Sequence, residues 1–296
     1  MKQFPISTAP FFTSFDAQEG VDMRLGTSSP LSYDSAENWA DTQIALGCRA
    51  VVFPVQSNEP EKKIIEYKEA ADKAGLSIAE VGVWRNALSQ DPDEQKRNMD
   101  YCVEQLRLAD FVGARCCVNV AGAFGPKWDG PYKENFSDEA RKKTIQMVRE
   151  IIDRAEVKNT FFTLEPMPWM IPTGPKDYAR LLEEVDRDRF AVHMDIINMT
   201  SSIERYFKAE EFVDECAEIL GDKIRSCHIK DVHLSMEYTT QLSECAPGCG
   251  EFPLRYYVSK MNEIDNDMPV ILEHLNTDEE YYKYMDYLKA ILKDLY

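Results

Sequence analysis

The chain has 296 residues, with 34 Lys and Arg against 52 Asp and Glu, so its formal net charge is −18. This excess of negative charge repels phosphate backbones and argues against general nucleic-acid binding. The 44% hydrophobic and 11% aromatic content is that of a globular chain, not a disordered one. No apolar run is long enough for a membrane span, and residues 1–5 lack the apolar core of a signal peptide. We therefore expect a cytoplasmic protein that binds neither nucleic acid nor a membrane.

Short apolar runs alternate with charged, helix-forming stretches along the chain. The runs are rich in Val, Ile and Phe without strict alternation, which is typical of parallel strands buried on both faces. The predicted strands are 6–12, 49–53, 76–83, 114–120, 160–164, 190–194, 224–229 and 269–275. The stretches 94–108 and 137–155 have apolar residues at helical spacing, and Ser137 is a suitable helix start. Gly75 and Gly221 stand where helices are expected to end.

Eight strand–helix alternations without a linker predict a single domain, 1–296, of the α/β class. The best architecture is a (β/α)8 TIM barrel. The main competitor is a doubly wound nucleotide-binding sheet, which needs G-x-G-x-x-G after an early strand. The G-x-G at 248–250 lies late in the chain and lacks the third glycine. The sequence therefore favours the barrel.

The eight cysteines are expected to be free thiols, because disulfides are rare in the reducing cytosol. Cys116, Cys117 and Cys227 lie in apolar runs, where cysteine behaves as a small buried hydrophobic residue. Cys245 and Cys249 have neither a second cysteine pair nor a neighbouring His, so a structural zinc site is not expected.

Ligand-type side chains stand at the ends of four consecutive predicted strands. In chain order they are Glu165, Asp195, His228 and Glu273. Barrel active sites are built at the C-terminal ends of the strands, so we expect these side chains to converge. Three carboxylates and an imidazole in one place repel one another unless a cation joins them, and they suit Mn²⁺, Mg²⁺, Co²⁺ or Zn²⁺. A single polar residue at a strand end is ordinary, but four in succession favour a metal site.

These strand ends, together with Leu-Glu-Pro-Met-Pro-Trp at 164–169 and His-Ile-Lys-Asp at 228–231, resemble the xylose isomerase-like barrel superfamily of sugar isomerases and epimerases. The resemblance covers essentially the whole chain. It implies that the four residues at the strand ends hold one divalent metal ion, with Mn²⁺ as the first expectation. In the ketose 3-epimerase branch the two glutamates also exchange the proton, so the catalytic residues here would be Glu165 and Glu273.

The chain also departs from the epimerase pattern. Epimerases of that branch have Asp-x-x-His after strand six and an Arg six residues after the strand-seven His, where this chain has Asn198 and Leu234. The segments 127–131, 165–169 and 195–198 are closer to a branch that resembles the larger subunit of bacterial C-glycoside deglycosidases, which cleave a 3-oxo-sugar from its aglycone. Related sequences of that branch carry His at the position where this chain has Tyr132. The resemblance therefore implies that an acid/base role of that His is either taken over by the phenol of Tyr132 or absent in this chain.

Both interpretations share one chemistry, in which a carboxylate removes the proton next to a metal-polarised sugar carbonyl and an enediolate forms. Our first hypothesis is a metal-dependent sugar isomerase or epimerase, and the alternative is a C-glycoside deglycosidase (a lyase). A retaining glycosidase is more distant because it would leave Asp195 and His228 unused. A sugar-binding barrel without activity is a further class, and a metal-dependent endonuclease is disfavoured by the acidic charge and by only four His. We expect a small sugar or glycoside as substrate and an oligomer, in the deglycosidase case with a smaller second subunit.

Several further side chains are candidates for substrate contact. Lys230 would either polarise the carbonyl or pair with a carboxylate. Trp128 and Trp169 would stack on a sugar ring or pack within their loops. His193 lies two residues before Asp195 and shares its inward direction, so it would either support a ligand residue or contact substrate. Glu80 would bind sugar hydroxyls or form a buried ion pair. The candidates for substrate binding are Glu80, Trp128, Tyr132, Trp169, His193, Asn198 and Lys230.

Overall fold

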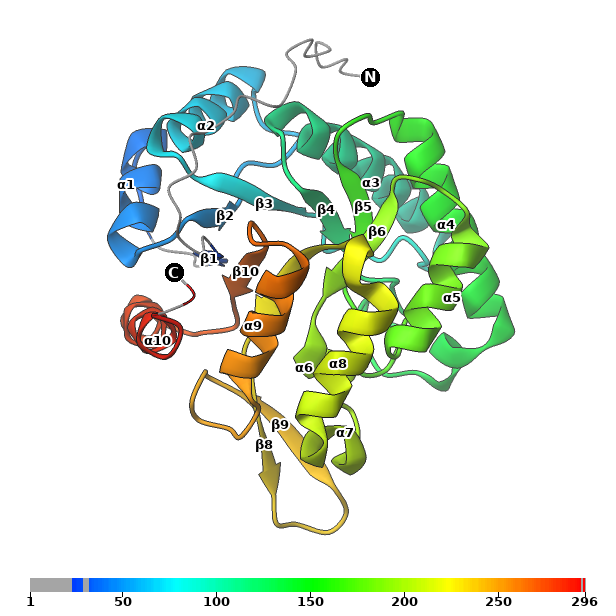
Figure 1. Ribbon diagram of the computed structural model, residues 1–296. Helices are drawn as coiled ribbons and strands as arrows, with labels where there is room; N and C mark the ends of the chain where they lie inside the picture. Colours follow the sequence, from blue (N-terminus) through cyan, green and yellow to red (C-terminus); the bar gives the residue numbers. More distant parts are fainter. Residues whose placement is uncertain (1–22, 29–31, 294, 296) are drawn as a thin grey trace.

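The computed structural model describes residues 23–28, 32–293 and 295. Its barrel strands are β1 (Arg24–Thr27), β2 (Ala50–Val52), β3 (Ser77–Gly82), β4 (Cys116–Asn119), β5 (Phe161–Leu164), β6 (Phe190–Met194), β7 (Ile224–Ile229) and β10 (Pro269–Leu272). They form a closed parallel barrel in the order β1-β10-β7-β6-β5-β4-β3-β2, with helices around the outside (Figure 1). The predicted (β/α)8 barrel is confirmed.

Helices follow the strands in the order that a (β/α)8 barrel requires. The long ones are α1 (Ala36–Leu46), α2 (Glu61–Ala74), α3 (Pro92–Val112), α4 (Asp138–Ala155), α5 (Pro175–Val185), α8 (Ala209–Leu220), α9 (Leu254–Ile264) and α10 (Asp278–Ile291). Short elements are η1 (Lys133–Phe136), α6 (Ile196–Met199), α7 (Ile203–Phe207), η2 (Gly221–Lys223) and the strands β8 (Asp231–Ser235) and β9 (Gln241–Cys245). Ser137 caps α4 by accepting the N–H of Ala140, and α2 and α8 end at Gly75 and Gly221, as predicted.

The first barrel strand differs from the prediction. The segment 6–12 lies outside the described residues, and β1 takes the first place by pairing with β10 and β2. The β1 sequence contains a glycine and two polar residues, so it has no apolar signal. The glycine has a packing reason, because a Cβ atom on Gly26 would collide with the carbonyl oxygen of Ala50 on β2.

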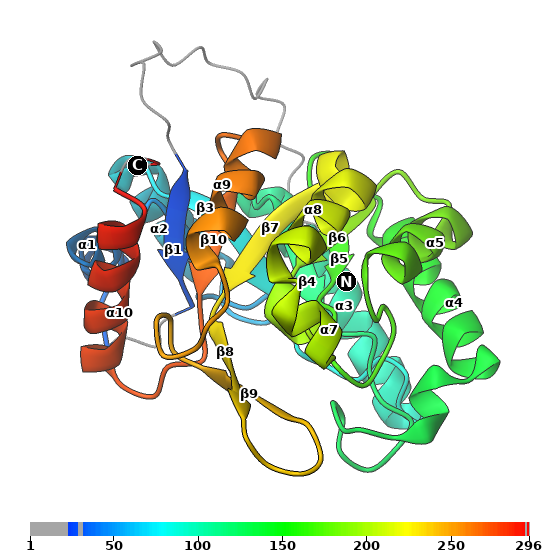
Figure 2. The same cartoon turned by 60° about the horizontal axis from the view of Figure 1, so that its bottom comes forward.

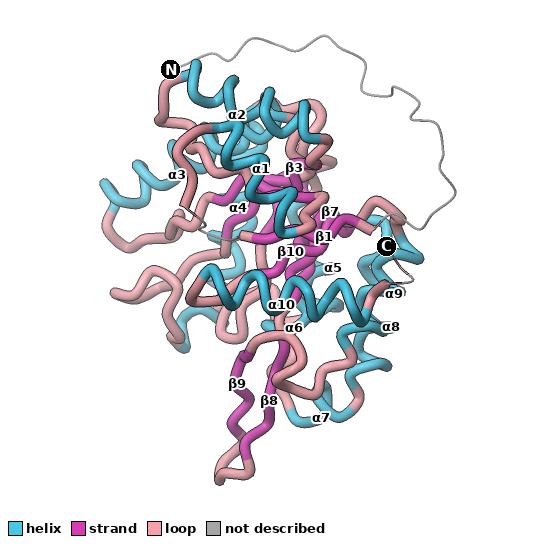
Figure 3. The backbone as a smooth tube through the Cα atoms, turned by 90° about the vertical axis from the view of Figure 1, so that its left-hand side faces the viewer, coloured by secondary structure: helices cyan, strands magenta, loops and turns pink. Residues whose placement is uncertain are grey.

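An antiparallel hairpin, β8–β9, follows β7 and projects away from the barrel (Figures 2 and 3). The sequence patterns did not predict it. Its base is held by the buried Asp231 carboxylate, which accepts backbone N–H groups from Val232 (2.8 Å), Gly248 (2.9 Å), Gly250 (3.1 Å) and Phe252 (3.0 Å). The hairpin therefore has a fixed origin beside the C-terminal end of β7.

The interior of the molecule fits the cysteine prediction. All eight cysteines are free thiols, and Cys116, Cys117 and Cys227 are completely buried. Along β7 the side chains alternate, so that Ser226 and His228 enter the barrel while Cys227 and Ile229 join the hydrophobic core outside it. Across the described ranges, no helix combines the length and apolar character that crossing a membrane requires.

Candidate metal centre and active site

The four strand-end residues do converge. Glu165 directly follows β5, Asp195 follows β6, His228 lies near the end of β7 and Glu273 follows β10. All four are buried, with at most 5% of each residue exposed. One ligand atom from each lies within 4.8 Å of the others. The barrel closure brings these strands together, so four positions far apart in the sequence become one cluster, which we call the strand-end cluster.

The imidazole of His228 is central to this cluster. Its Nδ1 atom lies 2.9 Å from Glu273 Oε1, 3.5 Å from Glu165 Oε1 and 3.6 Å from Asp195 Oδ2. None of these approaches is aligned as a hydrogen bond, so His228 Nδ1 is a buried polar atom without a hydrogen-bond partner among the described residues. Asp195 Oδ2 is in the same condition. Two ligand-type atoms therefore face the centre of the cluster without a hydrogen bond of good geometry, although Lys230 Nζ lies 2.6 Å from Asp195 Oδ2.

Lys230 is the one described cation inside the barrel beside these carboxylates. Its Nζ pairs with Glu273, lies 2.6 Å from Asp195 Oδ2 and lies 3.5 Å from Glu244 Oε2 on β9. Burial disfavours its charge, but Asp195 and Glu273 outweigh burial and hold the pKa of Lys230 well above its usual value. Of the two predicted roles, the ion pair is therefore observed. Glu244, which sequence reasoning missed, also accepts a contact from His274 Nδ1 at 2.9 Å.

The carboxylates have different affinities for protons in the metal-free protein. Burial and the neighbouring Glu273 charge raise the pKa of Glu165. Burial also opposes ionisation of Glu273, but His228 and Lys230 outweigh it and lower the pKa of Glu273 to about 2. The pKa of Asp195 is held well below its usual range, against burial, by Lys230 and His228. Two carboxyl groups with pKa values moved in opposite directions are suited to separate acid and base tasks.

Asn198 on α6 is tied to two members of the cluster. Its side-chain nitrogen donates to Glu165 Oε1 at 3.0 Å, and its backbone N–H donates to Asp195 Oδ1 at 2.8 Å. The amide thus orients the Glu165 carboxylate. Leu234, the second departure from the epimerase pattern, is half-buried on the hairpin and packs against the hydrophobic core.

A second buried group lies next to the strand-end cluster. Glu80 Oε1 lies 3.0 Å from His193 Nε2, and Glu80 Oε2 lies 3.3 Å from His228 Nε2. The hydroxyl of Ser226 donates to Glu80 as well. The rings of His193 and His228 meet edge to face with their centroids 4.1 Å apart. Glu80 and His193 were predicted to contact substrate, with a buried ion pair as the alternative for Glu80, and each side chain has a buried partner within the protein.

Two of the three aromatic candidates make hydrogen bonds to the backbone of the loop that follows β4. The Tyr132 hydroxyl accepts the N–H of Lys127 at 2.8 Å, and the Trp169 indole N–H donates to the carbonyl of Asp129 at 2.6 Å. Trp128 is 37% exposed. For Trp169, which was predicted either to stack on a sugar ring or to pack against the protein, the hydrogen bond to Asp129 corresponds to the packing role. A substrate contact by any of the three side chains stays a prediction.

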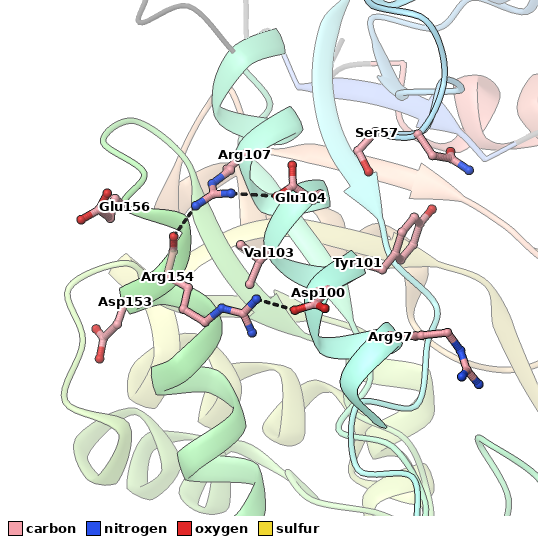
Figure 4. A pocket seen from close by; sticks show the side chains of 11 residues that line it. Ser57, Arg97, Asp100, Tyr101, Val103, Glu104, Arg107, Asp153, Arg154 and Glu156 are labelled. Carbon is pink, nitrogen blue, oxygen red and sulfur yellow. Dashed lines mark hydrogen bonds and ion pairs between the residues drawn. The ribbon is translucent and has the colours of Figure 1, made fainter. Parts of the chain in front are cut away.

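A groove on the outside of the barrel provides a contrast (Figure 4). It is lined by residues of α3 and the end of α4, among them Asp100, Arg107 and Arg154. Arg154 pairs with Asp100 at 2.5 Å, and Arg107 donates to the carbonyl of Arg154 at 2.6 Å. These charged groups satisfy one another on the surface. They hold the two helices together and, unlike the strand-end cluster, contain no unpartnered ligand-type atom.

Comparison with known proteins agrees with the fold. The model of the xylose isomerase-like TIM barrel family matches residues 34–291, so the chain belongs to that family. A curated relative, a probable endonuclease 4 from Persephonella marina, is 24% identical over 246 residues, or 80% of this chain and 83% of the relative.

Solved structures of similar fold come from several bacteria. A xylose isomerase-like TIM barrel protein from Mycobacterium smegmatis in complex with magnesium has a TM-score of 0.66 and 16% identity, covering 94% of this chain and 99% of that one. D-psicose 3-epimerase with D-tagatose from Clostridium cellulolyticum H10 has a TM-score of 0.66 and 14% identity, covering 93% and 99%. The 3-keto-D-glucoside 4-epimerase from E. coli has a TM-score of 0.67 and 16% identity, covering 92% and 100%. At these identities the likeness shows the fold alone.

Proposed function

We propose that this member of the xylose isomerase-like TIM barrel family is a divalent-metal-dependent enzyme that moves a proton at the carbon next to a sugar carbonyl. An isomerase or epimerase is the first form of this proposal. The observation that carries it is the buried strand-end cluster, in which Glu165 and Glu273 flank the unpartnered Nδ1 atom of His228. The pair of glutamates offers two proton-transfer groups beside one position for a cation.

The residues present fit such a cation. The three carboxylates of the strand-end cluster face a single ammonium group, Lys230, so two negative charges remain uncompensated if His228 is neutral. A divalent ion would balance them, and it would bind the Nδ1 lone pair of neutral His228 and share Asp195 Oδ2 with Lys230. A set rich in oxygen ligands with one imidazole suits Mn²⁺ or Mg²⁺, with Co²⁺ and Zn²⁺ as further possibilities. We propose Glu165, Asp195, His228 and Glu273 as the ligands.

A bound divalent ion supplies positive charge that polarises a sugar carbonyl and stabilises the negative charge of an enediolate. The protein supplies the proton chemistry. Glu165 and Glu273 lie on either side of the cation position, so one carboxylate can accept the proton from carbon and the other can return one. Asn198 keeps Glu165 oriented through its amide. Lys230 limits the repulsion between Glu273 and Asp195.

The comparisons support a sugar substrate without identifying it. Two proteins of similar fold are, by name, a D-psicose 3-epimerase and a 3-keto-D-glucoside 4-epimerase. The endonuclease 4 relative favours a different substrate, but the net charge of −18 disfavours DNA. In addition, the strand-end cluster contains only one His, and of the four His, all within the described residues, only His193 and His228 belong to a buried group that could hold a metal. A cytoplasmic location and an oligomer, with or without a smaller second subunit, stay predictions.

Cleavage of a 3-oxo-C-glycoside is the second candidate. The observation that favours it is that Asn198 binds Glu165 and Leu234 packs against the core. Neither position therefore offers the imidazole or guanidinium that the epimerase pattern places there. A retaining glycosidase stays the more distant alternative, because its mechanism needs only two carboxyl groups and would not use Asp195 and His228, the other two proposed ligands.

The test combines metal analysis with isotope exchange. Purified protein is analysed for bound metal and incubated in D2O with Mn²⁺ and a panel of ketoses and 3-oxo-glycosides, and loss of the proton next to the carbonyl is followed by ¹H NMR. We expect about one metal ion per chain and deuterium incorporation that a chelator abolishes. Glu273→Gln should slow exchange by about 10²-fold or more, because general base catalysis contributes that much. His233→Gln is the control, since His233 is exposed on the hairpin strand β8 and, within the described part of the chain, makes no hydrogen bond or ion pair with the strand-end cluster.

The products distinguish the two candidates. A new epimer or isomer supports the first form, and release of an aglycone without turnover of any free ketose supports the lyase. Activity that persists in chelator, or glycoside cleavage without exchange at carbon, would refute the proposal.

A further inference from the structure

We infer that Glu80 is a positioning residue that selects which nitrogen of His228 binds the cation. This inference rests on the proposed function, because it concerns the same metal site. Glu80 lies on β3, across the barrel from β7, and only 1% of it is exposed. Its contacts to His193, His228 and Ser226 place it on the side of the His228 ring opposite to the strand-end cluster.

The argument starts from the hydrogen-bonding capacity of a carboxylate. An ionised carboxylate only accepts hydrogen bonds, so each of its neighbours must donate. Each Glu80 oxygen lies within hydrogen-bond distance of an imidazole Nε2 atom, and Oε1 also accepts from the Ser226 hydroxyl, so the geometry is that of an ionised carboxylate that accepts from all three neighbours. Ser226 donates through its hydroxyl. His193 and His228 must then each carry a proton on Nε2, at 3.0 Å and 3.3 Å from the two carboxylate oxygens.

The consequence for His228 follows from its neutral form. A neutral imidazole carries one proton, and a ligating nitrogen carries none. With the proton fixed on Nε2 by Glu80, the free lone pair of His228 is on Nδ1. That is the atom that lies 2.9 Å from Glu273 and within 3.6 Å of Asp195, and it has no hydrogen-bond partner among the described residues. Glu80 thus directs the lone pair into the strand-end cluster.

His193 is oriented by the same carboxylate. Its Nε2 faces Glu80, its Nδ1 is buried without a partner in the described part of the chain, and its ring lies edge to face against His228. It therefore restricts the rotation of the His228 ring. Hydrogen bonds from a metal-ligating imidazole to a carboxylate are a general way to fix its tautomer and raise its basicity.

The variant Glu80→Gln tests this inference with little change of shape. The amide oxygen takes the place of Oε1, which accepts from both Ser226 and His193, so the amide nitrogen faces His228 and donates to it. His228 must then present an unprotonated Nε2 and carry its proton on Nδ1. Affinity for Mn²⁺, measured from the free-ion EPR signal, should fall by about 10–100-fold. Long-range ¹H–¹⁵N spectra of the Mg²⁺-loaded proteins, which contain only four His, should show Nε2–H for His193 and His228 in the wild type and a switched tautomer for one of them in the variant.

The control is Asp231→Asn, which makes the same chemical change in a buried carboxylate that accepts four backbone N–H groups and touches no proposed ligand. It should lower stability but change Mn²⁺ affinity by no more than about threefold. A folded Glu80→Gln protein with wild-type affinity would overturn the inference. If that variant does not fold, the wild-type spectrum decides, since a His228 without a proton on Nε2 in the Mg²⁺-loaded protein overturns it equally. A wild type that binds no Mn²⁺ would instead refute the proposed function, and this inference with it.

Discussion

Replacing Lys230 by Met should destabilise the metal-free protein strongly and the metal-bound protein much less. The side chain of Lys230 is only 1% exposed, and its Nζ lies 2.6 Å from Asp195 Oδ2 and pairs with Glu273. At this separation one ion pair is worth about 6 kcal/mol for an effective dielectric constant of about 20, before the cost of desolvation is subtracted. Methionine keeps most of the volume and removes the charge, so both carboxylates lose their compensating ammonium.

The net effect is smaller than the Coulomb energy. Removing one partner of a buried ion pair costs about 3–5 kcal/mol, because it leaves an uncompensated charge in the interior. For a chain of this length we expect a fall in the unfolding temperature of about 5–8 °C in the presence of chelator. With saturating Mn²⁺ the carboxylates recover a counter-charge, so the difference between variant and wild type should shrink to less than half.

The assay is urea and thermal unfolding of both proteins in EDTA and in Mn²⁺. The matched control is Lys260→Met, since Lys260 pairs with Asp214 and Glu263 on the surface and its loss should have no measurable effect in either buffer. Two results would refute the reasoning. One is an equal loss of stability for Lys230→Met in EDTA and in Mn²⁺, and the other is a loss in EDTA below about 1 kcal/mol, the value of an exposed pair.

Three further outcomes follow from the same contacts. The pKa of His228 lies well above its usual value, because the charges of Glu273, Glu80 and Glu165 outweigh the effect of burial. Protonated His228 therefore stabilises the folded protein fully below about pH 6.5, and this stabilisation is lost as the pH rises through the pKa of the folded state. The urea concentration at the unfolding midpoint of the metal-free protein should therefore fall from neutral to alkaline pH, and a midpoint that does not change with pH would contradict this. Calorimetry in two buffers should find that Mn²⁺ binding releases about one proton at pH 7. Asn198→Ala should slow deuterium exchange by about 10–100-fold, as expected for a lost bond to a charged group, with Mn²⁺ affinity nearly unchanged. Tyr178→Phe, which removes a buried hydroxyl that donates to the carbonyl of Leu164 at 2.7 Å, should cost about 1–3 kcal/mol in urea unfolding and leave metal affinity unchanged.

Much of the site could be predicted because the barrel turns sequence position into spatial position. The ends of β6 and β7 were predicted to the residue, and Glu165 and Glu273 directly follow β5 and β10. Adjacent parallel strands end at the same edge, so four polar residues at strand ends become neighbours without any long-range information. The inward direction of His193 and Lys230 followed from the two-residue period of a strand, and their contacts with Glu80 and Asp195 confirm it.

The sequence did not predict β1, the β8–β9 hairpin or the contact of Glu244, because the local sequence of these segments has no apolar pattern that indicates their structure. β1 has no apolar run, and its place is set by close packing of Gly26 against β2 rather than by its own side chains. The β8–β9 hairpin consists mainly of half-buried and exposed residues, so it has no core-facing pattern. Glu244 reaches Lys230 only because Asp231 fixes the base of that hairpin. Such a contact depends on a turn of the chain that no single-strand periodicity describes.

The organisation of the site depends on the register of one strand. β7 sends Ser226 towards Glu80, His228 between Glu80 and the strand-end cluster, and the chain then places Lys230 beside Asp195. These three residues alternate with apolar ones, so a shift of one residue would turn every polar group into the hydrophobic core. The proposed proton exchange, the balance of charge and the proposed choice of ligating nitrogen are thus coupled through a single element. For this reason the proposed metal site and the Glu80 network should be gained or lost together when β7 is perturbed, whereas changes on the β8–β9 hairpin should affect Lys230 alone.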